Sequence, residues 1–111
     1  MERSLNPYYI PRLVNYRLSI QDAADRLLRE LKTDLDTLRL KTRKKEIVSK
    51  RQAMAYLLRW YGFTYSSIAL LFMQDHCTVI HSERTVENDM LTNKELKDFI
   101  RRMQHTVITK N

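Results

Sequence analysis

A chain of 111 residues holds one domain with a hydrophobic core, and its 43% hydrophobic and 30% charged residues are ordinary for a soluble globular protein. The net charge of +7 and the pI near 9.8 indicate a polyanionic partner, most often nucleic acid and sometimes an anionic membrane surface; a merely basic surface is the alternative. The single cysteine, Cys77, excludes an intramolecular disulfide. The longest apolar stretch, near residues 68–72, is far too short to span a bilayer, and no N-terminal run suits a signal peptide. We therefore expect a cytoplasmic protein.

Strong helix formers are abundant, and the chain has only one glycine and two prolines, which predicts an all-α fold. The beginning of the chain is the exception, because Pro7 and Pro11 bias the residues before them away from helix. We expect residues 1–18 to form an irregular arm and residues 19–111 to form the domain. The aromatic side chains of the arm favour packing on its own domain over contact with a partner protein or a DNA groove.

Two helices are predicted first. An apolar stripe with the helical period of 3.6 runs through residues 20–32, with Ser19 or the residue after it as the N-cap. A short helix follows at residues 35–38, capped by either Thr33 or Asp34.

A basic run follows at residues 39–45, in a predicted loop. Positive charges continue into the next helix at Lys50, Arg51 and Arg59. A run of charges is usually a solvated face, but this clustering between packed helices favours phosphate binding.

The longest and most apolar helix is predicted at residues 46–61, and we expect it to form the centre of the core. Its inward positions are Ile47, Val48, Ala53, Met54, Tyr56, Leu57 and Leu58. Gly62 falls where a left-handed residue ends a helix, and Thr64 is a candidate N-cap. A short helix at residues 67–73 follows, and residues 73–74 make a turn.

The stretch DHCTVIH at residues 75–81 predicts the start of a further helix that runs to about residue 90. Asp75 is a good N-cap, because its carboxylate accepts hydrogen bonds from the free N–H groups of the first turn. Short polar side chains then alternate with Val79 and Ile80, which can face a core. Such a helix, placed after a sharp turn from another short helix, is typical of the second half of a helix-turn-helix.

The sequence TNKE at residues 92–95 reads as a capping box with Thr92 as the N-cap, and it predicts the start of the last helix. The apolar residues of that helix share one face: Leu96, Phe99, Ile100 and Met103. No internal repeat or low-complexity tract is visible along the chain.

Two separated motifs resemble one known family. KTRKKEIVSKRQAMAYL at residues 41–57 resembles the basic loop and following helix of the C-terminal DNA-binding domain of DnaA, the bacterial chromosomal replication initiator. SIALLF at residues 67–72, followed by DHCTVIH at residues 75–81, resembles the signature that closes that domain. The similarity covers about residues 23–90, with both motifs in the right order and spacing. It implies a Trp-repressor-like helical bundle with a helix-turn-helix that binds duplex DNA at a short asymmetric box.

The resemblance also implies roles for individual residues. The residues that would face base edges in the major groove are Asp75, His76, Cys77 and Thr78, and Arg43 would enter the neighbouring minor groove. The residues that would hold phosphates are Lys44, Lys45, Arg51, Gln52, Arg59, Thr64, Ser66 and His81. The chemistry is compatible, because a carboxylate accepts from a cytosine amino group, small side chains touch thymine methyl groups and arginine suits a narrow minor groove.

Three departures from the family pattern concern the identity of the DNA box. The chain is one residue shorter between Phe72 and Asp75, where the initiators have glycine and this chain has only Met73 and Gln74. Gln74 stands where the family usually has arginine, so one positive charge is lost beside the capping carboxylate. Cys77 stands where threonine or serine is usual, which keeps the size but loses a good hydroxyl.

The chain has no phosphate-binding loop of the GxxxxGK[ST] kind and no room for an ATPase domain, so we do not expect it to melt an origin. It resembles the DNA-reading module standing alone, as in small phage or mobile-element proteins. Such a module could tether something to a site, compete with the host initiator or regulate a promoter.

A metal or catalytic site is a further interpretation of His76, Cys77 and His81. Cys77 and His81 share a helical face, but two ligands are too few for a structural zinc site. A Cys/His catalytic pair would also need an oxyanion site and an orienting third group, and nothing identifies either. We therefore expect no metal, no cofactor and no enzymatic activity.

The leading hypothesis is sequence-specific binding of double-stranded DNA at the nucleoid, in replication initiation or its regulation. The alternative is a protein-interaction or dimerisation module without specific DNA readout, in which the arm and the last helix dock replication proteins or a second copy. A small nuclease is a third and weaker hypothesis, because no paired carboxylates are placed to hold a metal ion.

Overall fold

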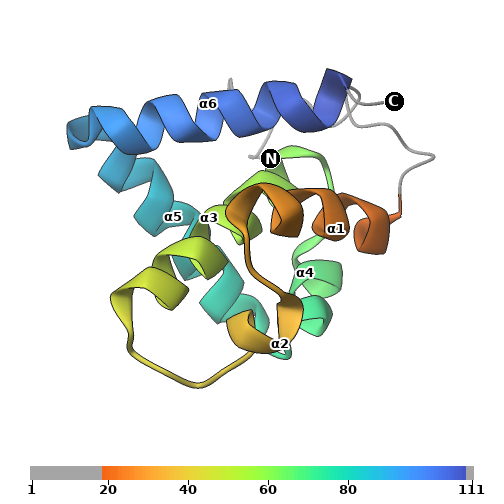
Figure 1. Ribbon diagram of the computed structural model, residues 1–111. Helices are drawn as coiled ribbons and strands as arrows, with labels where there is room; N and C mark the ends of the chain where they lie inside the picture. Colours follow the sequence, from red (N-terminus) through yellow and green to blue (C-terminus); the bar gives the residue numbers. More distant parts are fainter. Residues whose placement is uncertain (1–18, 110–111) are drawn as a thin grey trace.

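The computed structural model describes residues 19–109 of the chain. Within this range it contains six α-helices and no strand, which confirms the predicted all-α fold (Figure 1). The helices are α1 (Ile20–Leu31), α2 (Leu35–Leu38), α3 (Lys45–Trp60), α4 (Tyr65–Phe72), α5 (His76–Thr92) and α6 (Lys94–Thr109). None of these described helices is long and apolar enough to cross a membrane. The predicted arm, residues 1–18, lies outside the described residues.

Polar side chains cap the start of most helices, as the sequence predicts. The N-cap residues of α1, α2, α4 and α5 are Ser19, Asp34, Thr64 and Asp75, and each accepts a hydrogen bond from the backbone N–H three residues later. For α2 the cap is therefore Asp34 and not Thr33. The backbone N–H and the hydroxyl of Thr37 donate to this carboxylate and hold the pKa of Asp34 below its ordinary value.

The bounds of α4 differ from the prediction of residues 67–73. The helix begins at Tyr65, because Thr64 accepts from the N–H of Ser67 at 3.1 Å and starts the helix directly behind itself. It ends at Phe72, since Met73 is left-handed with φ 58° and cannot continue a right-handed helix.

The predicted capping box at Thr92 is wrong. α5 continues past residue 90 to Thr92, which is still helical, and Asn93 is the junction residue. The Oδ1 atom of Asn93 accepts from the N–H of Leu96 at 3.1 Å, while the N–H of Asn93 donates to the carbonyl of Asp89 at 2.8 Å. One asparagine thus ends α5 and begins α6, because asparagine caps helix starts as well as threonine does.

The centre of the core is α3, as expected. Met54, Leu57 and Leu58 are fully buried and lie in one cluster with apolar side chains of the other helices. Ile47 and Val48 are only half-buried, which corrects the expectation that they lie in the core centre. They belong to the first turns of α3, which lie at the edge of the bundle (Figure 1). Replacing Leu57 by alanine would cost about 2–5 kcal/mol of stability.

The two sides of the bundle differ. α6 lies along one side, over α1 and the end of α5, whereas α2 and the loop after it lie on the opposite side (Figure 1). The predicted apolar face of α6 is confirmed, because Ile100 and Met103 are buried and Leu96 and Phe99 pack against the core. The hydroxyl of Tyr61 donates to the carbonyl of Met103 at 3.1 Å, and burial raises the pKa of that hydroxyl.

Candidate nucleic-acid interface

A tight turn joins α4 to α5. Met73 is left-handed there (φ 58°, ψ 46°), a conformation that costs a residue with a Cβ atom roughly 1–2 kcal/mol. The backbone N–H of Gln74 donates to the carbonyl of Ala69 at 2.8 Å and so closes the end of α4. Asp75 is extended (φ −92°, ψ 169°) and starts α5. The two helices are therefore separated by three residues, as in a helix-turn-helix.

The first turn of α5 presents short polar side chains to solvent. His76, Cys77 and Thr78 are exposed, whereas Val79 is fully buried and Ile80 is half-buried. α5 starts on the side of the molecule that lies away from α6, near α2 (Figure 1). The predicted alternation of polar and core-facing residues is thus present, and the polar residues face outward.

A carboxylate cap fixes this first turn. The Oδ1 atom of Asp75 accepts from the backbone N–H of Thr78 at 2.7 Å. That N–H, and next the hydroxyl of Thr78, lower the pKa of Asp75 from its ordinary value, so the carboxylate is charged at neutral pH. A charged acceptor therefore stands at the point where α5 would meet a partner.

Two histidines line the same helix. The Nε2 atom of His76 lies 3.0 Å from the hydroxyl oxygen of Ser66 on α4, a hydrogen bond that joins the two helices of the helix-turn-helix. This bond occupies Nε2 and leaves Nδ1 of the exposed imidazole to meet a partner. His81 lies one turn further along α5, with its Nε2 atom 3.5 Å from the hydroxyl of Thr85.

The loop after α2 exposes a cluster of cations. Lys41, Arg43, Lys44 and Lys45 all reach solvent, and the loop that carries the first three lies on the side of the molecule opposite α6 (Figure 1). The hydroxyl of Thr42 accepts from the backbone N–H of Lys44 at 3.2 Å and shapes the end of the loop. The predicted basic loop therefore ends at residue 44, and Lys45 begins α3.

Two further arginines hold the start of this loop. The Nη1 atom of Arg51, on α3, donates to the carbonyls of Leu38 and Leu40 at 3.0 and 3.1 Å. The Nε atom of Arg39 donates to the carbonyl of Leu71 on α4 at 2.8 Å. Sequence reasoning selected Arg51 only as a phosphate ligand and Arg39 only as the first residue of the basic run. No local pattern could reveal these bonds, because each joins segments that are far apart in the sequence.

Arg59, on α3, packs against the start of the helix-turn-helix. Its guanidinium carbon stands 4.2 Å from the centre of the Tyr65 ring, and its Nη1 atom donates to the carbonyl of Phe63 at 3.2 Å. The hydroxyl of Tyr65 donates to the buried carboxylate of Glu83 at 2.6 Å, which links α4 to α5. Sequence reasoning missed Glu83, although its place four residues after Val79 puts it close to the buried face of α5.

The predicted contact residues fall into two groups. The exposed ones are Arg43, Lys44, Lys45, Thr64, Ser66, Asp75, His76, Cys77, Thr78 and His81. The half-buried ones are Arg51, Gln52 and Arg59. The structure thus places most of them where a large ligand can reach them, and it gives Arg51 and Arg59 additional bonds within the fold.

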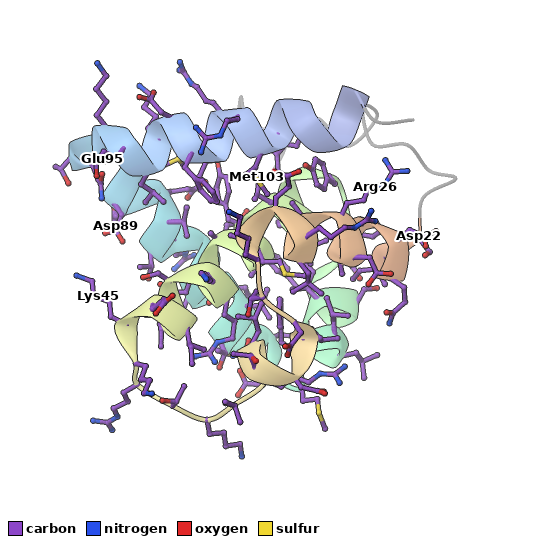
Figure 2. All side chains as sticks on the ribbon, viewed as in Figure 1. Asp22, Arg26, Lys45, Asp89, Glu95 and Met103 are labelled. Carbon is purple, nitrogen blue, oxygen red and sulfur yellow. The ribbon has the colours of Figure 1, made fainter. Side chains whose placement is uncertain are left out.

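A separate cleft of about 550 Å³ lies between the start of α3 and the corner of α5 and α6. Figure 2 shows Lys45 on one side of it and Asp89 and Glu95 on the other, and Gln52 also contributes to its lining. The cleft carries both signs of charge, in contrast to the cationic loop. Within the described part of the chain, no three His, Cys, Asp or Glu side chains are grouped to hold a metal ion.

A short helix, a tight turn and a capped helix with an exposed polar first turn together make this a helix-turn-helix domain. The family described as "Bacterial dnaA protein helix-turn-helix" matches residues 20–86, and the chain belongs to this family. The chain is also similar to the chromosomal replication initiator protein DnaA of Flavobacterium psychrophilum, with 38% identity over 71 residues. That alignment covers 60% of this chain and 14% of the relative.

Proposed function

We propose that this chain binds double-stranded DNA in a sequence-specific manner, at a short box of the kind that DnaA proteins bind. The first turn of α5 would lie in the major groove, and residues 39–45 would lie on the adjoining minor groove and its phosphates. The observation that carries the proposal is the exposed polar first turn of α5, fixed by Asp75 and by the Ser66–His76 bond. Membership of the DnaA helix-turn-helix family supports it.

The chemistry of the exposed groups suggests a division of roles. Asp75, His76, Cys77 and Thr78 are short enough to meet base edges without holding the helix away from the groove. Arg43 projects from the loop and would enter the minor groove, where a narrow A·T-rich segment attracts a guanidinium.

The remaining predicted residues would hold phosphates and fix the register of the domain on the duplex. They are Lys44, Lys45, Arg51, Gln52, Arg59, Thr64, Ser66 and His81. Arg51 can combine this role with its bonds to the loop, because a guanidinium has five N–H donors and these two bonds use only its Nη1 atom.

The biological role that fits this proposal is replication initiation or its regulation. The protein would act on DNA in the cytoplasm, by binding and not by catalysis. Residues 19–111 would form the DNA-binding domain, with residues 1–18 as an arm. The match spans 14% of the Flavobacterium relative, so competition with a full initiator for one box is the role closest to the part that is shared.

Fluorescence anisotropy with a labelled duplex tests the proposal. We expect tighter binding to a duplex with a DnaA-type box than to a scrambled duplex, and a steep loss of affinity as salt is raised. Equal affinity for the two duplexes would refute specific readout. Loss of binding to both duplexes at moderate salt would refute DNA binding altogether.

A protein-interaction role is the second candidate, and exposed apolar side chains favour it. Leu70, Met73 and Leu91 have exposed fractions of 79%, 73% and 81%. Sedimentation of the protein alone and with the box duplex separates the two candidates. A stable dimer without any DNA complex would favour protein interaction.

A further inference from the structure

Arg39 connects the loop to the helix-turn-helix. It is half-buried at the end of α2, and its Nε atom donates to the carbonyl oxygen of Leu71 at 2.8 Å. Leu71 lies in the last turn of α4, where carbonyl groups have no later helical N–H to bind. The guanidinium therefore supplies a donor that α4 itself cannot supply.

Arg51 fixes the backbone on both sides of Arg39. Its Nη1 atom binds the carbonyls of Leu38 and Leu40, which are the residues before and after Arg39. The backbone of Arg39 is thus tied to α3, while its side chain is tied to α4. The start of the basic loop is held between two helices that precede the turn into α5.

The bond from Arg39 to Leu71 lies close in sequence to the left-handed residue of the turn. Met73, two residues after Leu71, is left-handed although it has a Cβ atom, and Asp75 follows as the cap of α5. A donor that fixes the last turn of α4 restrains the turn that sets the direction of α5.

We propose that Arg39 is a positioning residue that sets the distance between the cationic loop and the first turn of α5. The inference rests on the proposed DNA-binding function and deepens it, because it names a residue whose Nε–H acts on specificity through a bond inside the protein. A domain that contacts the two grooves with two separate segments discriminates between DNA sequences only if both segments reach their grooves at the same time. Arg39 keeps Arg43 and Thr78 in one rigid frame through its bond to Leu71.

Arg39→Lys is the sharpest variant, because it keeps the positive charge and places a methylene where Nε stands. If Arg39 acts through its Nε–H, we expect the ratio of affinities for box and scrambled duplexes to fall about tenfold, the size of one lost base contact. We expect the slope of log K against log salt to stay unchanged, because lysine keeps the positive charge that Arg39 contributes to the loop. An unchanged ratio in Arg39→Lys would overturn the proposal.

Lys41→Ala is the matched control. Lys41 is an exposed cation two residues further along the same loop. If it lies near phosphates, its removal lowers the salt slope by at most about 0.9 and leaves the affinity ratio unchanged. An equal fall of the ratio in Lys41→Ala and Arg39→Lys would overturn the proposal, since any change in loop charge would then have the same effect.

A rescue variant tests the link from Arg39 to the turn. Glycine adopts the left-handed conformation without the cost of a Cβ atom, so Met73→Gly relaxes the turn that Arg39 restrains. We expect Met73→Gly to restore at least part of the affinity ratio in the Arg39→Lys background. If the double variant discriminates no better than Arg39→Lys alone, the link from Arg39 to the turn is wrong.

A measurement without DNA distinguishes failure of this inference from failure of the proposed function. Hydrogen exchange of arginine Nε–H groups, followed by nuclear magnetic resonance, should show slow exchange for Arg39 and fast exchange for the exposed Arg43. Equal exchange rates would overturn the bond on which the inference rests. If the wild-type protein showed slow exchange but no preference for the box, the proposed function would fail while the Arg39 bond stood.

Discussion

The first turn of α5 and the basic loop after α2 are both exposed, but they are held in place differently. Asp75 holds the first turn of α5 through an N–H only three residues away, and the helix behind it supplies the rest of the geometry. Residues 41–44 of the loop are not helical, and Arg39 and Arg51 hold the start of the loop by bonds to backbone carbonyls.

This difference shows where each part of the candidate interface is vulnerable. A substitution in the first turn of α5 changes what the helix presents, while its position is preserved by the cap. A substitution at Arg51, outside the loop, changes where the whole loop lies. Substitutions in the two parts should therefore have different effects on DNA binding and on stability.

The largest effect is expected from Arg51→Ala. Removal of the guanidinium leaves the carbonyls of Leu38 and Leu40 without this donor, which should cost about 1–3 kcal/mol of stability. The loop should also lose its place, so affinity should fall for both duplexes and most for the box duplex, because the loop and α5 would no longer reach their grooves together. Urea unfolding and anisotropy titrations measure the two effects.

Tyr61→Phe is the control for stability. It removes a buried hydrogen bond to the carbonyl of Met103 on α6, on the side of the molecule away from the loop, at a cost of about 1–3 kcal/mol. DNA affinity should stay near that of the wild type while the protein remains folded. If Arg51→Ala were as stable as the wild type, the bonds from Arg51 to the loop would not contribute to the free energy of unfolding.

The next largest effect is expected from His76→Ala. Loss of the exposed imidazole should reduce discrimination between box and scrambled duplexes by about 1–3 kcal/mol, the value of one good base contact. Stability should change little, because the cap at Asp75 is retained. Competition titrations with single-base variants of the box would locate the affected base.

Ser66→Ala is the companion variant, since it removes the bond at Nε2 and keeps the imidazole. It should weaken binding to all duplexes with little loss of discrimination. If Ser66→Ala relaxed base preference as much as His76→Ala, the bond rather than the imidazole would carry the readout.

Lys44→Ala should have a smaller and uniform effect. Loss of one phosphate contact lowers the slope of log K against log salt by about 0.9, without a change in base preference. Arg101→Ala removes the same charge from the exposed surface of α6 and should leave the slope unchanged. Titrations at several salt concentrations compare the two variants, and equal slopes would remove Lys44 from the interface.

The smallest effect concerns the charge of the cap. The pKa of Asp75 is lower in the folded protein than its ordinary value of 3.8, so the ionised carboxylate stabilises the fold above that value. This contribution is lost as the pH falls through the lowered pKa. Asp75→Asn keeps a capping oxygen, so the amide signal of Thr78 should no longer titrate with the cap. Asp34, whose pKa is lowered in the same way, should titrate unchanged in both proteins.

Much of the fold follows from local patterns. Ser19, Thr64 and Asp75 were predicted as caps, and they cap, because a cap acts over three residues and its signal lies in the adjacent sequence. The apolar periods predicted the buried faces of α1 and α6 for the same reason. The wrong prediction at Thr92 also has a local cause. Thr92 and Asn93 are both good N-caps, and the one that caps α6 depends on where α5 ends.

The residues of the candidate interface could be predicted from the sequence, but the bonds that hold its segments in place could not. The exposed residues of the loop and of α5 were found through a family resemblance, and their contacts with DNA remain predictions. The bonds of Arg39, Arg51 and Arg59 could not be predicted, because a long cationic side chain has the same sequence signal in solvent and folded against a carbonyl. Their partners are fixed only once α3, α4 and α5 have packed.

The bond from Arg39 to Leu71 spans 32 positions of the chain, which has a consequence for the order of folding. Closing so long a segment costs entropy that only the packing of α3 against α4 can repay. The cap at Asp75 needs only the first turn of α5 and can form as soon as that turn becomes helical. On heating, the loop should therefore leave its place before helix content falls. The temperature at which discrimination between duplexes disappears should then lie below the melting temperature seen by circular dichroism.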